Sequence, residues 1–278
     1  MPSYETPEPV TVIVEFDLGN VQLTASPRKD TVVEVLPSNG VEDNDVRTAQ
    51  QTRVTYANGI LTLKGPRKRS PFGKVGSIDV TIDLPAGSHL QANSAMGDFA
   101  SQGRLGECRV KTSVGDIRLD ETGVADLRTS HGDIRVGRMV GDAEINGSGR
   151  IDIAAVVGSA TVRNGIGETA IGTVTGDLKA NTSMGRVAVD LAEGSVDIRS
   201  SHGSIQVNEV VRGRIDLQTS LGGLDIGIRE SSAAWLDVSS KVGVVRNSLG
   251  AAEGPGDAEH TVEIHGRTTA GDIVIRRA

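Results

Sequence analysis

A six-residue phrase returns along most of the chain at a nearly constant spacing. It reads Thr-Ser-His-Gly-Asp-Ile at residues 129–134, and the other copies keep its glycine in the fourth position. These glycines are Gly97, Gly115, Gly132, Gly149, Gly167, Gly185, Gly203, Gly222, Gly243 and Gly271. Consecutive copies up to Gly243 lie 17 to 21 residues apart, and an insertion precedes the last one. Because helical repeats need roughly 33–47 residues, this shorter period indicates a repeated β-structure.

Apolar and polar residues alternate within each copy. Ile117 and Leu119 flank Arg118, for example, which is the period of a half-buried β-strand. A second glycine about nine residues further on begins another alternating segment, as at residues 141–145. Two short strands joined by glycine corners form one coil of a β-solenoid, and stacked coils pair in parallel about 4.8 Å apart. We therefore predict an all-β fold, a parallel β-solenoid (β-helix) of coils of about 18 residues, with an irregular β-rich N-terminal cap.

The composition agrees with a narrow interior. The chain of 278 residues contains only three Phe, one Trp and two Tyr, whereas it contains 35 Gly. Proteins of this length usually fill part of their core with aromatic rings. We expect Val, Ile, Leu and Ala to fill the interior of these coils instead.

The repeat divides the chain into five parts. We predict a tail over residues 1–9, a cap with early coils over 10–90, regular coils over 91–249, a mobile loop over 250–260 and a terminal coil over 261–278. Within the cap, strands are predicted at residues 10–16, 20–24, 31–36, 52–56, 60–64 and 78–84. The cap should cover backbone groups that the first coil would otherwise leave unpaired.

These motifs carry a family resemblance. Leu84-Pro85-Ala86-Gly87, followed by Thr/Ser-Ser-x-Gly-Asp-Ile-x-Val units, resembles bacterial β-strand-repeat proteins known as "putative adhesins", a domain family of unknown function. The resemblance covers roughly residues 10–278. It implies a β-solenoid with no established catalytic residues, and the adhesin name implies surface exposure. In coil length and scarcity of aromatic residues, the chain is also similar to bactofilins, cytoskeletal β-helices that polymerise end to end. This similarity does not rest on shared motif residues.

Charge and sequence composition exclude several classes of partner and site. The net charge of −7 opposes general binding to nucleic acid, and no apolar run approaches the length of a membrane-spanning helix, about 18 residues. Residues 1–9 contain neither the basic nor the apolar segment of a secretory signal, so we expect a cytoplasmic protein. Cys108 is the only cysteine, which excludes an intramolecular disulfide and a thiolate metal cluster. We predict no cofactor.

Asp98, Asp116 and Asp133 follow the repeat glycine in three successive copies. Their side chains should form a column on one surface, with neighbouring Cα atoms about 4.8 Å apart. Arg118 and Arg135 stand two residues further on and face the same way, so a solvated ladder of alternating charge is expected. Two alternatives remain open: the carboxylates could hold Ca²⁺, or they could act as the acids of a polysaccharide-cleaving β-helix.

Polar residues also stand three positions before each repeat glycine. They are Ser94, Thr112, Thr129, Asn146, Asn164, Thr182, Ser200, Thr219, Ser240 and Thr268. We expect them to hydrogen-bond along the stack and to satisfy backbone groups at the corners. Cys108 shares a column with Ala143, Ala160 and Val196, and we predict that it is a buried packing thiol.

The histidines show no metal-binding pattern in the sequence. His131 and His202 occupy the same repeat position but lie four copies apart, so about 19 Å should separate them. Because Met, Val, Ile and Leu fill this position elsewhere, we expect both rings to be partly packed. His89, His260 and His265 have no Cys or His partner at ligand spacing.

One segment of the chain is strongly basic. Arg67, Lys68, Arg69 and Lys74 lie in a predicted hairpin loop near the cap. A solvated loop is the default interpretation, and contact with an anionic partner is the alternative.

The sequence as a whole indicates a non-enzymatic scaffold or binding module with an unknown protein partner. A self-assembling, bactofilin-like filament built by stacking coil on coil is the alternative. A carbohydrate-active β-helix enzyme that uses the Asp98–Asp116–Asp133 face is a second alternative. No catalytic, cofactor-binding or metal-binding residue is assigned.

Overall fold

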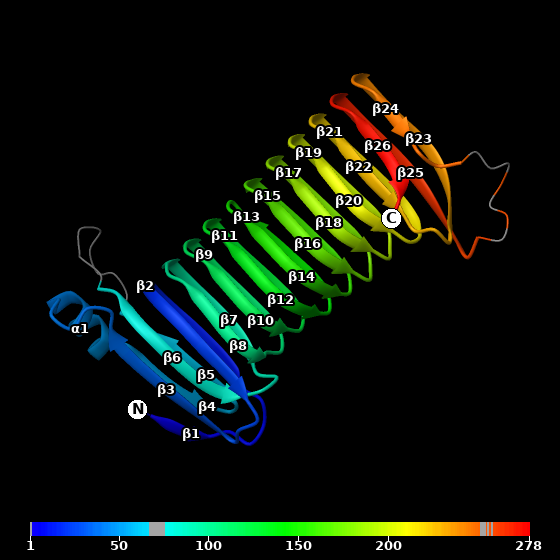
Figure 1. Cartoon of the computed structure of the whole chain (residues 1–278). Coiled ribbons are helices and arrows are strands. Elements are labelled where there is room, and N and C mark those ends of the chain that lie inside the picture. The colour runs from blue at the N-terminus through cyan, green and yellow to red at the C-terminus, as the bar shows by residue number, and fades with distance from the viewer. Residues whose placement is uncertain (1, 67–75, 251–253, 255, 257) are drawn as a thin grey trace. The chain divides into compact units, whose positions relative to one another are not determined.

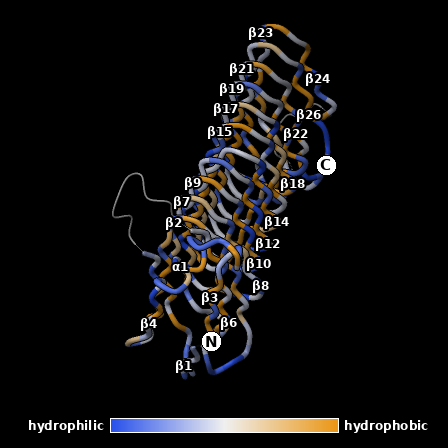
Figure 2. Tube along the Cα trace, turned by 90° about the vertical axis from the view of Figure 1, so that its left-hand side faces the viewer, coloured by the Kyte–Doolittle hydropathy of each residue, from blue (hydrophilic) through white to orange (hydrophobic). Residues whose placement is uncertain are grey.

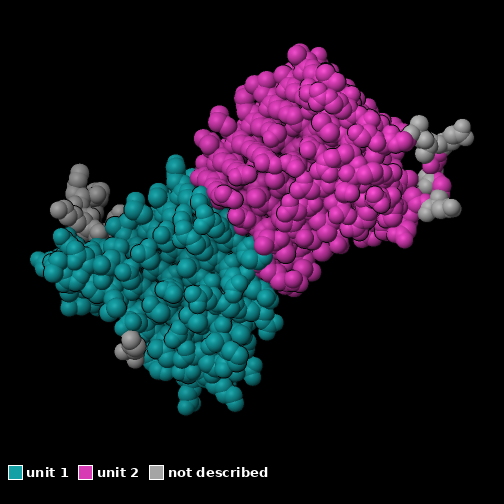
Figure 3. All heavy atoms as spheres, in the orientation of Figure 1, with its two compact units in different colours: residues 1–137 teal, residues 138–278 magenta. Residues whose placement is uncertain are grey.

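The computed structural model describes residues 2–66, 76–250, 254, 256 and 258–278. It forms two compact units, Met1–Gly137 (unit 1) and Arg138–Ala278 (unit 2), each of which is described by itself (Figures 1 and 3). The basic residues Arg67, Lys68, Arg69 and Lys74 lie outside the described residues, as do residues 251–253, 255 and 257 of the predicted mobile loop. In the described part of the chain, no helix is long and apolar enough to cross a membrane.

The predicted parallel β-solenoid is confirmed. Each regular coil supplies its first strand to one parallel sheet, sheet B, and its second strand to another, sheet A. In unit 1 the regular coils comprise β7 (His89–Met96) with β8 (Phe99–Arg104), β9 (Cys108–Val114) with β10 (Ile117–Thr122), and β11 (Ala125–His131), which is followed by β12 (Ile134–Val140) across the unit boundary.

Unit 2 is built from coils of the same kind. Its coils comprise β13 (Ala143–Gly147) with β14 (Ile151–Val157), β15 (Ala160–Ile166) with β16 (Thr169–Val174), β17 (Leu178–Met184) with β18 (Val187–Ala192), β19 (Val196–His202) with β20 (Ile205–Val210), β21 (Gly213–Leu221) with β22 (Leu224–Ile228), β23 (Ser232–Val242) with β24 (Val245–Asn247), and β25 (His260–Ala270) with β26 (Ile273–Arg277).

Residues at equivalent positions of neighbouring copies pair with one another in the sheets. Ile117 pairs with Phe99 in unit 1, and Val187 pairs with both Thr169 and Ile205 in unit 2. The alternation of apolar and polar residues therefore recurs from coil to coil (Figure 2). Small branched side chains fill the interior as predicted, and Ile198, Val207 and many others are fully buried. Burying each such side chain stabilises the fold by about 1.5–3 kcal/mol.

The N-terminal region contains the strands predicted at residues 31–36, 52–56, 60–64 and 78–84, but it differs from the prediction elsewhere. β1 (Ser3–Glu5) lies within the predicted tail and pairs antiparallel with β3 (Asp30–Pro37). The strands predicted at 10–16 and 20–24 are one continuous strand, β2 (Thr11–Ser26), which runs from sheet B into sheet A. The other elements of this region are α1 (Asp43–Gln51), β4 (Arg53–Ala57), β5 (Ile60–Lys64) and β6 (Ile78–Pro85).

The order of coils in space differs from their order in the chain at both ends. In unit 1, β2 lies between β5 and β7 in sheet B and between β6 and β8 in sheet A. In unit 2, β25 lies between β21 and β23, and β26 lies between β22 and β24. Figure 1 shows β25 and β26 in red between the yellow and orange strands. The predicted terminal coil is therefore an inner coil, and the coil of β23 and β24 stands at the edge of unit 2.

Candidate functional site

The carboxylates predicted as an acidic column do lie on successive coils. The backbone N–H of Asp116 donates to Oδ1 of Asp98 at 2.8 Å, and the backbone N–H of Asp133 donates to Oδ1 of Asp116 at 2.8 Å. Arg118 pairs with Asp116, and Arg135 lies 3.5 Å from Asp133. Each hydrogen bond satisfies a backbone group at a corner, so the contacts assign this column to holding the coils together.

The metal alternative for this column gains no support from its geometry. In the part of the chain that the structure describes, no three His, Cys, Asp or Glu residues are grouped so that they could hold a metal ion. The carboxylates instead accept hydrogen bonds from backbone amides and from an arginine.

The polar residues three positions before each repeat glycine, here called the polar column, are mostly buried and bond chiefly to glycine carbonyls. Ser94 donates to Oγ1 of Thr112 at 3.1 Å, as a ladder of like residues requires. Thr219 instead donates to the carbonyl oxygen of Gly203 at 2.9 Å, and Thr268 donates to that of Gly222 at 2.9 Å. Two neighbouring members of the column, Thr182 and Ser200, have buried hydroxyls without a hydrogen-bond partner among the described residues. Most members of the column therefore satisfy a backbone carbonyl at a corner of a coil, whereas Thr182 and Ser200 do not do so in the part of the chain that the structure describes.

The corner position of the histidines is exposed, contrary to the prediction. His131 and His202 both point to solvent, because the chain leaves the strand at this position and turns the side chain away from the core. Apolar residues at the same position are exposed too; they are Met96, Val114, Ile166, Met184, Leu221 and Val242.

Cys108 is fully buried, as predicted. Burial raises the pKa of its thiol to about 11, because a thiolate would lose its hydration there. A thiol of this kind packs against its neighbours and is a poor nucleophile near neutral pH.

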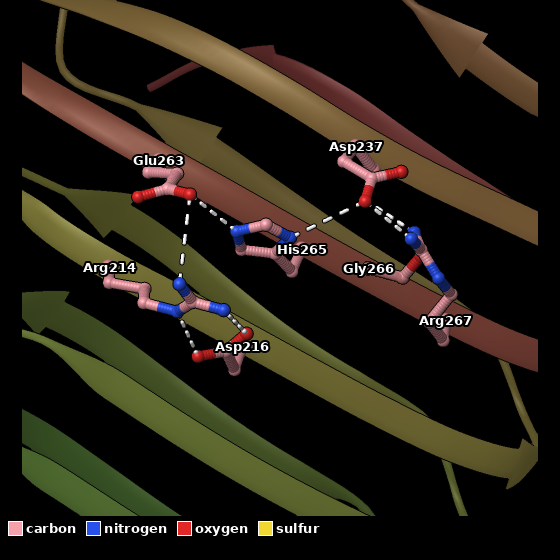
Figure 4. Close-up of polar contacts among 7 residues, drawn as sticks. All are labelled: Arg214, Asp216, Asp237, Glu263, His265, Gly266 and Arg267. Atoms are coloured by element: carbon pink, nitrogen blue, oxygen red, sulfur yellow. Dashed lines mark hydrogen bonds and ion pairs between the residues drawn. The ribbon is translucent and has the colours of Figure 1, made fainter.

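A cluster that the sequence did not predict lies on the outer face of sheet B in unit 2 (Figure 4). Its centre is His265 of β25, whose Nε2 lies 2.7 Å from Oε1 of Glu263 and whose Nδ1 lies 3.5 Å from Oδ2 of Asp237 on β23. Arg267 pairs with the same carboxylate of Asp237. On the neighbouring β21, Arg214 lies 2.7 Å from Asp216 and 3.7 Å from Glu263.

Neighbouring charges shift the pKa values of two groups in this cluster. The Arg267 guanidinium, which hydrogen-bonds Asp237, holds the pKa of that carboxyl below its ordinary value, and His265 adds to this effect. The hydrogen bond to Asp216 raises the pKa of Arg214. Arg214, Asp237 and Arg267 therefore place charges of both signs on three adjacent strands.

The chain's only tryptophan adjoins this cluster. Trp235 on β23 is 56% exposed, and its ring centroid lies 5.4 Å from that of His265. A cavity of about 1430 Å³ opens beside it, and Arg214, Glu263 and Arg277 are among its lining residues. We call Trp235, Arg214, Glu263 and this cavity the Trp235 face.

Sequence reasoning missed the Trp235 face because its members are far apart in the repeat. Trp235 and Glu263 lie 28 positions apart and stand side by side only because β25 pairs with β23. A single Trp in a chain with only five other aromatic residues was the signal that the sequence offered.

Comparisons with known proteins found likenesses only among solved structures. The sequence matches no protein-family model and no curated protein. A "putative adhesin" from Parabacteroides distasonis is 12% identical, with 98% of this chain and 95% of that chain covered and a TM-score of 0.37. Another from Parabacteroides merdae is 10% identical, with 98% and 94% covered and a TM-score of 0.35.

A "putative lipid binding protein" from Parabacteroides distasonis is also similar. It is 12% identical, with 100% of this chain and 95% of that chain covered and a TM-score of 0.29.

Proposed function

We propose that this chain is a non-catalytic binding module that holds a protein partner at the Trp235 face. The observation that carries the proposal is the exposure of Trp235, the one tryptophan of the chain, beside a cavity that charged residues help to line. Trp and Arg are the residues most enriched at the energetic centres of protein interfaces. Trp235 and Arg214 stand together at this face.

The surroundings of Trp235 suit a polar protein surface. The tryptophan ring supplies a large and rigid apolar contact, because it has few rotamers to lose on binding. Arg214 and Glu263 next to it offer both signs of charge to the partner. The cavity beside them can take a protruding side chain of the partner. These are the parts of a mixed interface with an apolar centre and a polar rim.

Neither alternative function is favoured by a comparable feature. The Asp98–Asp116–Asp133 column engages backbone amides and arginines, which supports a structural role for those carboxylates. A filament would need two ends that fit each other. The edge of unit 1 instead consists of the antiparallel strands β1 and β4.

Site-specific crosslinking tests the binding proposal. A photo-reactive amino acid replaces Trp235 in one variant and the exposed Gln218 of β21 in the control, and each variant is mixed with soluble and membrane fractions of the source cells. We expect a protein to be crosslinked from position 235 and not from 218. The fraction that holds this protein also tests the predicted cytoplasmic location.

Two substitutions complete this test. Trp235→Ala and Arg214→Ala should each weaken binding of the crosslinked protein at least tenfold, whereas Gln218→Ala should leave binding unchanged. Equal binding by the Trp235→Ala variant and the unaltered chain would refute the proposal.

A further inference from the structure

We propose that the edge of unit 2 formed by β23 and β24 is an interface with a second copy of the chain, and that β23 pairs antiparallel with β23 of that copy to close a twofold dimer. This inference is independent of the binding role of the Trp235 face. It follows from the open core of the edge coil, from the free edge of its strand and from its charge pattern.

The core of the edge coil is uncovered. Leu236 and Val245 lie in register with Ile264 and Ile273 of the inner coil, and the two isoleucines are fully buried. Leu236 is only half-buried, and Val245 is 41% exposed. The difference arises because each inner coil has a neighbour on both sides, whereas this coil has one on a single side among the residues that the structure describes. An apolar end face of this kind gains free energy when another surface covers it.

The backbone of the edge strand is also unpaired on one side. β23 has 11 residues and pairs with β25 along its whole length. Among the described strands it has no second neighbour, whereas the inner strand β21 pairs with both β19 and β25. A long, free strand edge is a template for a further strand, and proteins that remain monomeric usually protect such an edge.

The charges along β23 favour a second copy as the occupant. Asp237 and Lys241 both project outward from the strand, two positions on either side of Ser239. Antiparallel pairing centred on Ser239 places Asp237 of each copy opposite Lys241 of the other, which makes two favourable cross-strand pairs by symmetry. Pairing centred on Asp237 would instead set like charges against each other.

The same register also covers the open core. With Ser239 on the twofold axis, the second copy lies against Leu236 and Val238, which are in register with the inner-coil residues Ile264 and Gly266. A twofold contact uses the same patch on both copies and is complete with two chains. A closed dimer is therefore expected, rather than the end-to-end filament considered from the sequence.

Sedimentation of charge variants tests the proposal. The unaltered chain should pass from monomer to dimer with rising concentration and stop at the dimer. Asp237→Lys and Lys241→Asp should each raise the dimer dissociation constant at least tenfold, because each brings like charges together. A mixture of the two variants should dimerise again, since the first variant then carries a lysine at both positions and the second carries an aspartate at both.

Gln218→Lys is the matched control, because it places a new charge on the same outer face but on an inner coil, and it should leave the dissociation constant unchanged. A monomer at every concentration, growth beyond the dimer, or a mixture that stays monomeric would each overturn the proposal. Lys241 is exposed, so its variant remains informative even if Asp237→Lys weakens the contacts to His265 and Arg267.

Crosslinking provides a second measurement. Ser239→Cys should form an intermolecular disulfide under mild oxidation, because the two residues at position 239 would face each other across the axis. Gln218→Cys should not form one. Crosslinking of both variants to the same extent, or of neither, would contradict the proposed interface.

Discussion

Oδ1 of Asp98 accepts a hydrogen bond of 2.8 Å from the backbone N–H of Asp116, one coil further along the chain. Asp116 repeats this contact to Asp133, so each carboxylate closes the corner of the next coil. The spacing of these acids resembles that of a metal or catalytic site, but their hydrogen bonds link one coil to the next.

Replacing Asp116 by Ala should therefore reduce stability. The substitution leaves the amide of Asp133 without its carboxylate acceptor, and we expect the free energy of unfolding to fall by about 1–2 kcal/mol. Urea unfolding measures this change. Asp126→Ala is the control, because Asp126 pairs with Arg128 on the surface, and it should cost about 0–1 kcal/mol. Equal losses in the two variants would contradict the corner role of Asp116.

Two members of the polar column should respond differently to the loss of a hydroxyl. Thr219→Val removes the hydrogen bond to the carbonyl of Gly203 and should cost about 1–2 kcal/mol. Thr182→Val, at the equivalent position, should be neutral or stabilising, because its buried hydroxyl has no partner among the described residues. Thermal unfolding of both variants compares them directly. A larger loss for Thr182→Val would show that its hydroxyl is satisfied in solution.

A repeat glycine should tolerate no side chain. Gly185 has a φ of +133°, and a Cβ built there would lie 2.0 Å from the carbonyl oxygen of Gly167. Gly185→Ala should therefore destabilise the chain by roughly 2–4 kcal/mol, as measured by urea unfolding. Gly250→Ala is the control, since its Cβ would meet no atom within 4 Å, and it should change stability by less than about 0.5 kcal/mol. A mild effect at Gly185 would mean that neighbouring coils can move apart.

The buried thiol should make stability depend on alkaline pH. The folded chain holds Cys108 protonated up to a pKa of about 11, whereas in the unfolded chain the thiol ionises near its ordinary value of 9.0. The stabilisation due to the thiol is therefore complete below pH 9 and is lost as the pH rises toward 11. Urea midpoints of the unaltered chain and of Cys108→Ala should converge across this range, in a reducing buffer. Parallel curves would show that the thiol does not resist ionisation.

The coil could be predicted from the sequence because its causes are local. The alternation with a period of two places Ile117 and Leu119 inward, and the repeated glycines mark the corners. The strand length, the register and the acidic column therefore all derive from the repeat itself. The helix α1 could not be predicted in this way, because Asp43–Gln51 contains a single large apolar residue, Val46, and no helical apolar stripe.

The sequence alone determined the coil, its small-residue core and the stacking of equivalent positions, since each depends on neighbours about 18 residues apart. Only the tertiary structure decided which coil stands at the edge. Repeated coils offer nearly identical sheet edges to one another, so local pattern cannot tell whether β25 pairs with β23 alone or enters between β21 and β23. That choice exposes Trp235, joins His265 to Asp237 and leaves the core of the edge coil open, which is why both proposed interfaces became visible only in the folded chain.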